Sequence, residues 1–113
     1  MKTPLPGAPV RGSKTGQPVM ALLDLLGRRM ALRILWELSK TELKFRPLQA
    51  AADTNPSVLN TRLGELKRAG VVALGPDGYH LTETGRELVQ HLLPLTAWAN
   101  EWARKIERQP GKG

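Results

Sequence analysis

The chain has 113 residues, a length that suits one domain with short tails, and 41% of the residues are hydrophobic. Seventeen basic against ten acidic side chains leave a formal charge of +7, which favours a polyanionic partner, nucleic acid before an acidic membrane surface. The absence of cysteine excludes disulfides and thiol chemistry, and no apolar run approaches the ~20 residues of a membrane span, so we expect a cytoplasmic protein.

The two ends of the chain have little to bury. Residues 1–17 contain three prolines, three glycines and the basic residues Lys2, Arg11 and Lys14, and residues 109–113 have a similar composition. We therefore predict a disordered basic tail over 1–17, one domain over 18–108, and a second disordered tail over 109–113.

Apolar residues recur at helical spacing through the first half of the domain. One short helix is predicted over residues 20–26, ended or kinked near Gly27, and a second from Met30 to about Ser39. Residues 43–45 alternate in polarity and are compatible with a short strand. A third helix is predicted over residues 46–52, with a proline tolerated in its first turn.

The next helix has clear start and stop signals. Asn55 can cap its free amide groups, and Pro56 fits the first helical position. Gly70 is suited to end it, because glycine adopts the left-handed conformation at low cost. These signals predict a helix from Pro56 to Ala69 that follows the preceding helix after a tight turn.

A hairpin and a long helix complete the chain. Residues 71–74 and 79–81 flank the turn sequence 75–78, which predicts a β-hairpin. Thr82 can cap the last helix, whose apolar residues follow a heptad-like pattern, and Pro94 is expected to kink or split it. This order of elements predicts a mainly α fold with a small β-hairpin, a winged helix-turn-helix with terminal dimerisation helices.

The helix over 56–69 has one apolar and one small polar face. Leu59, Leu63 and Leu66 share a narrow arc that must face the core. Polar side chains on the opposite arc can contact bases or phosphates in a major groove, although a plain solvated face is the alternative. The predicted DNA contacts on this helix are Ser57, Asn60, Thr61, Arg62, Gly64 and Arg68. Lys44 and Arg46, at the start of the preceding helix, are also predicted contacts.

Three further points qualify this surface. Arg62 has an alternative role, in which its head pairs with an acid at the edge of the core. Additional candidates for phosphate contacts are Arg28, Arg29, Arg33 and Lys40. The tip of the hairpin is short and acidic at Asp77, so we expect it to contact DNA little.

Over about residues 17–106 the sequence resembles the HxlR-type helix-turn-helix regulators, relatives of the MarR group. The segments that carry the resemblance include residues 32–38, 58–66, 69–72 and 81–88. The resemblance implies a homodimeric winged-helix repressor or activator, with the second helix of the motif in the major groove and terminal helices at the dimer interface. Gln17 stands where the family often has a cysteine, so thiol-based sensing does not carry over.

The apolar stripe of the last helix gives a physical reason for a homodimer, since such a stripe needs a partner surface. The predicted interface residues are Leu22, Leu26, Leu92, Leu95, Trp98, Trp102 and Ile106. The three tryptophans, including Trp36, could instead line a pocket for an effector of unknown identity, but packing is the commoner role.

The sequence does not indicate an enzyme. With two histidines, no cysteine and no phosphate-binding loop, we expect no catalytic site, metal or cofactor. The predicted partners are double-stranded DNA and a second copy of the chain, with no membrane. The alternative is a winged-helix module for protein interaction or dimerisation that lacks sequence-specific DNA binding, which the acidic hairpin tip and the small polar residues favour.

Overall fold

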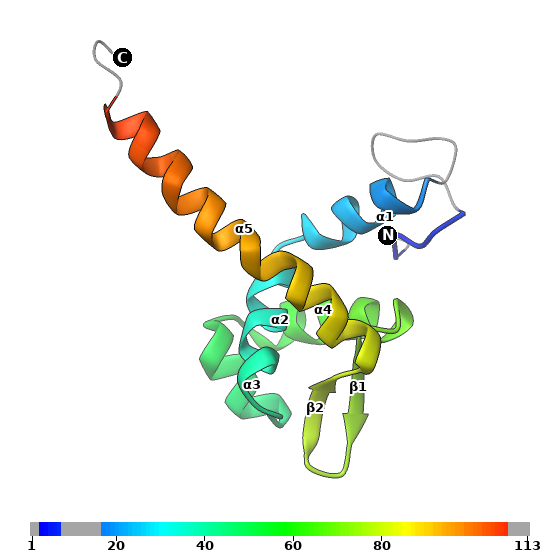
Figure 1. The fold of residues 1–113 in the computed structure, drawn as a ribbon. Coiled ribbons are helices and arrows are strands. Elements are labelled where there is room, and N and C mark those ends of the chain that lie inside the picture. The colour runs from blue at the N-terminus through cyan, green and yellow to red at the C-terminus, as the bar shows by residue number, and fades with distance from the viewer. Residues whose placement is uncertain (1–2, 8–16, 109–113) are drawn as a thin grey trace.

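The computed structural model describes residues 3–7 and 17–108, which form five helices and one two-stranded sheet (Figure 1). The prediction of a mainly α fold with a small hairpin is confirmed. In chain order the elements are α1 (Pro18–Leu26), α2 (Ala31–Lys40), α3 (Phe45–Ala52), α4 (Pro56–Arg68), β1 (Val72–Gly75), β2 (Gly78–Leu81) and α5 (Glu83–Arg108).

Helices α2, α3 and α4 enclose the core. Each contributes leucine or isoleucine side chains at helical spacing, so that one face of each helix is removed from water. The largest fully buried side chains all come from these three helices: Ile34, Leu35, Leu48, Leu59, Leu63 and Leu66. The arc of α4 that was expected to face the core does so.

The hairpin follows α4 directly. β1 and β2 pair antiparallel, from Val72 opposite Leu81 to Gly75 opposite Gly78. Leu43 adds a single bridge, because its N–H donates to the Tyr79 carbonyl at 3.1 Å and the Tyr79 N–H donates back at 2.8 Å. The predicted strand over 43–45 is therefore reduced to one residue, since α3 already begins at Phe45.

Helix α5 packs tightly on the hairpin at its start and projects from the body at its end (Figure 1). The Thr82 hydroxyl caps it by accepting the Gly85 N–H at 3.0 Å. A Cβ on Gly85 would lie 2.1 Å from the Val71 carbonyl oxygen, so only glycine permits this approach. The helix continues across Pro94, so of the two expected effects of this proline, a kink or a split, the split does not occur. Among the described helices, none is both long and apolar enough to cross a membrane.

Candidate nucleic-acid interface

The ends of α4 are fixed by the residues that its sequence indicated. The Asn55 side chain accepts the Val58 N–H at 2.9 Å, and Pro56 occupies the first turn. Gly70 has a φ of +80°, the left-handed conformation that ends the helix. α4 therefore begins and ends where local sequence signals predicted, within one residue.

The polar face of α4 is open to solvent. Ser57, Asn60, Thr61 and Arg68 are exposed, on the side opposite the buried leucines. Gly64 is half-buried beneath the Arg68 side chain, since a Cβ there would lie 3.4 Å from an Arg68 guanidinium nitrogen. The five residues form one continuous surface of short side chains and one arginine.

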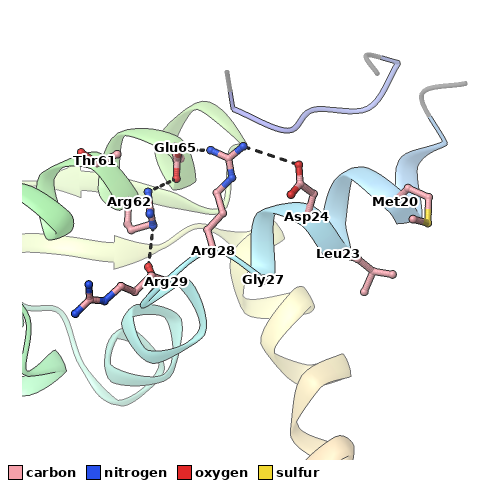
Figure 2. Close-up of a pocket in the computed structure, with 9 residues that line it drawn as sticks. All are labelled: Met20, Leu23, Asp24, Gly27, Arg28, Arg29, Thr61, Arg62 and Glu65. Carbon is pink, nitrogen blue, oxygen red and sulfur yellow. Dashed lines mark hydrogen bonds and ion pairs between the residues drawn. The ribbon is translucent and has the colours of Figure 1, made fainter. Parts of the chain in front are cut away.

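Arg62 turns away from that surface. Its Nε donates to the Arg29 carbonyl at 2.7 Å, and its guanidinium lies 3.0 Å from a Glu65 carboxylate oxygen (Figure 2). The i, i+3 spacing of Arg62 and Glu65 favours this pair. Of the two roles that the sequence left open for Arg62, this geometry is that of an arginine paired with an acid.

The other basic candidates divide into two groups. Arg28 is ion-paired with Asp24 and Glu65, and Arg33 and Lys40 lie 2.9 and 3.6 Å from Glu37. Arg33 also donates to the Ala51 carbonyl at 2.8 Å. Among residues 17–70, the exposed basic residues for which no ion pair is found are Arg29, Lys44, Arg46, Lys67 and Arg68. Lys67, in the last turn of α4, belongs to this group although it was not among the predicted contacts.

A short amino-terminal segment touches the same surface. The Arg68 Nε donates to the Thr3 hydroxyl at 2.9 Å, and Pro4 is buried. Residues 8–16, which hold Arg11 and Lys14, lie outside the described residues, so the predicted tail and domain boundaries remain predictions.

The predicted dimer residues fall into three environments. Leu26 is buried in the core of its own domain, and Leu22 and Leu92 pack against that core. Ile106 is half-buried. Leu95, Trp98 and Trp102 are exposed, and the rings of the two tryptophans stack with centroids 5.8 Å apart. Five further large apolar side chains that are exposed on the helices were not among the predicted interface residues: Val19, Leu23, Leu32, Trp36 and Leu93.

An apolar groove runs between α2 and α5. Leu32 and Trp36 line it from α2, and Val89, Leu93 and Leu95 line it from α5. Within the described residues no cluster of three histidine or acidic side chains could hold a metal ion.

Comparison with known proteins identifies relatives over most of the chain. A family model described as HxlR-like helix-turn-helix matches residues 25–107. An uncharacterised HTH-type transcriptional regulator, YvaP of Bacillus subtilis (strain 168), is 32% identical over 88 residues, which cover 71% of this chain and 82% of YvaP.

Solved structures give the same result. The quinone-bound YodB from B. subtilis superposes with a TM-score of 0.70 at 26% identity, over 74% of this chain and 96% of YodB. A putative regulator of the MarR family from Enterococcus faecalis V583 has a TM-score of 0.70 at 25% identity, over 87% of this chain and 99% of that chain. YvaP and the E. faecalis protein are described as transcriptional regulators rather than enzymes, in agreement with the non-enzymatic prediction.

Proposed function

Because this chain belongs to the HxlR-like helix-turn-helix family of transcriptional regulators, we propose that it binds specific DNA sequences as a homodimer, with α4 in the major groove. Such a role would place the protein in the cytoplasm with the chromosome. The observation that carries the proposal is the open polar face of α4, held by three fully buried leucines on the opposite side.

The residues of this face suit the reading of base edges. Asn60 and Arg68 carry the bidentate groups that recognise adenine and guanine, and the hydroxyls of Ser57 and Thr61 can bond to either bases or phosphates. Arg62 is left out of the proposed contacts because its guanidinium is bonded to Glu65 and to the backbone of Arg29.

Phosphate contacts are assigned to the exposed basic residues around the helix-turn-helix. Lys44 precedes α3 and Arg46 lies in its first turn, where the first helix of such a motif crosses the DNA backbone. Lys67 extends the same positive surface at the far end of α4. The acidic Asp77 at the hairpin tip supplies no such contact, so the wing is expected to add little.

The contact with a second copy of the chain is assigned to the exposed apolar side chains of α5 and α1. Trp98 and Trp102 are 63% and 54% exposed in the single chain, and burying a large apolar side chain contributes about 1.5–3 kcal/mol. A two-fold dimer would present its two α4 helices about 34 Å apart, one turn of DNA, and would favour a palindromic site.

Selection of bound fragments from a random DNA pool tests the proposal directly. We expect enrichment of a palindrome, and Asn60→Ala and Arg68→Ala should each weaken binding to it by about 1–3 kcal/mol. Arg108→Ala, at the exposed end of α5, is the matched control and should leave affinity unchanged. Binding without enrichment of any sequence would favour the alternative, an interaction or dimerisation module, to which the acidic wing tip also points.

A further inference from the structure

Two acidic side chains are buried in the described part of the chain, and they differ in what they connect. Glu37 is 8% exposed and Glu65 is 3% exposed. Glu37 pairs with Arg33 and Lys40 of its own helix α2, and Arg33 also donates to the Ala51 carbonyl in α3, so this network reaches neither α1 nor α4. Glu65 pairs with Arg62 of its own helix α4 and also with Arg28, which lies in the connection between α1 and α2.

Both oxygens of the Glu65 carboxylate are used in this network (Figure 2). One oxygen accepts a hydrogen bond from Arg28, whose guanidinium also lies 3.8 Å from Asp24 in α1. The other lies 3.0 Å from Arg62, which in turn donates to the Arg29 carbonyl at 2.7 Å. α4 is therefore joined to the end of α1 and to the following backbone by two separate arginines.

A network of this kind restricts orientation more than it adds stability. A buried ion pair often contributes no more to the free energy of unfolding than apolar residues of the same size. Charge-assisted hydrogen bonds are, however, directional, and they lose energy when the partners rotate. Here a rotation of α4 about its axis would pull Glu65 and Arg62 away from partners on α1 and its connection, and would also move the exposed face that holds Thr61.

We propose that Glu65 is a positioning residue that fixes the orientation of α4 relative to α1 through Arg28 and Arg62. α1 carries the exposed apolar side chains Val19 and Leu23, so it lies on the surface assigned to the second copy. Glu65 thereby sets the spacing at which the two α4 helices of a dimer meet DNA. The inference rests on the proposed function for its effect on DNA, but the orientation itself can be measured without DNA.

The first experiment measures the distance between spin labels on Val19→Cys and Asn60→Cys, which label uniquely because the chain has no cysteine. Labelled protein is mixed with a large excess of unlabelled protein, so that each pair of labels belongs to one chain. We expect a narrow distance distribution that broadens or shifts its maximum in Glu65→Gln and stays narrow in Glu37→Gln, the matched change of a buried carboxylate.

The second experiment measures affinity for the selected palindrome with its half-sites moved apart in steps of one base pair. Each step rotates one half-site by roughly 35°, since B-DNA has about 10 base pairs per turn. The unaltered protein and Glu37→Gln should prefer one spacing, whereas Glu65→Gln should lose or shift that preference. Arg28→Gln should act in the same direction while the Glu65–Arg62 pair remains, which keeps the test valid if Glu65→Gln does not fold.

The outcomes separate the two proposals. An unchanged distance distribution in both Glu65→Gln and Arg28→Gln overturns the positioning role, whatever the protein does with DNA. A broadened distribution together with no sequence preference in the unaltered protein overturns the proposed function and leaves the positioning of α4 supported.

Discussion

Gly64 lies within α4 at a position where its packing does not require glycine. Its φ is not in the left-handed region, and a Cβ there would meet only the flexible end of Arg68, at 3.4 Å. Glycine inside a helix costs roughly 0.5–1 kcal/mol relative to alanine. Gly64 therefore lowers stability without a packing reason. Because it lies at the centre of the proposed DNA-binding face, we infer that the absence of a side chain allows a base edge to approach α4 closely.

Gly64→Ala should therefore separate stability from function. We expect the free energy of unfolding to rise by about 0.5–1 kcal/mol, because the unfolded chain loses conformational freedom, while affinity for the selected DNA falls. Chemical denaturation and a DNA titration measure the two quantities. Ala50→Gly, in the exposed face of α3, is the control for helix propensity alone. Equal or tighter DNA binding by Gly64→Ala would show that the glycine has no role in recognition.

The hydrogen-bonding role of a single residue could be predicted where its partner is close in sequence. The caps at Asn55 and Thr82 bond to amides three residues away, so the local pattern was enough. Arg28 also pairs with Glu65, which is 37 residues distant, and no spacing rule connects these two. Glu65 lies only three residues from Arg62, but the Arg29 carbonyl that Arg62 also bonds lies in the α1–α2 connection, whose path the local sequence does not give, so both roles of Arg62 stayed open.

At the scale of elements, helix α5 shows what a sequence pattern does and does not decide. The heptad-like apolar stripe predicted a helix, but Pro94 left open whether this helix would be split. A proline inside a helix removes one hydrogen bond and costs about 3 kcal/mol, so the segment beyond it must be stabilised by other interactions. Since that segment exposes Leu95, Trp98 and Trp102, contact with a second chain is the interaction that these residues can supply.

Trp102→Ala should shift the protein toward the monomer. Removing an indole ring from an interface costs the burial free energy of a large apolar side chain, about 1.5–3 kcal/mol, and the neighbouring Trp98 loses its stacking partner. Sedimentation velocity over a range of concentrations measures the dissociation constant. Leu74→Ala is the control, because Leu74 is equally exposed but lies on the hairpin. An unaltered dissociation constant for Trp102→Ala would remove this helix from the interface.

At the scale of the whole molecule, composition predicted a basic protein but not which charges face outward. Residues 1–46 hold nine basic and three acidic side chains, a net of +6. The fold then pairs Arg28, Arg33 and Lys40 with acids and leaves Lys44, Arg46, Lys67 and Arg68 on the surface around α3 and α4. The exposed basic side chains of α3 and α4 that are not paired with an acid are therefore fewer than the sequence suggests, and they lie on the helix-turn-helix.

Salt dependence distinguishes such a localised surface from net charge alone. The logarithm of the binding constant should fall linearly with the logarithm of salt concentration, with a slope of about −0.9 for each phosphate contacted. Arg46→Ala removes two contacts from a dimer and should reduce the slope by about 1.8. Arg104→Ala removes the same charge from α5, where Arg104 is paired with Glu101 at 2.6 Å, and should leave the slope unchanged. If both substitutions reduced the slope equally, the affinity for DNA would depend on the total charge of the protein, and the assignment of phosphate contacts to α3 would be wrong.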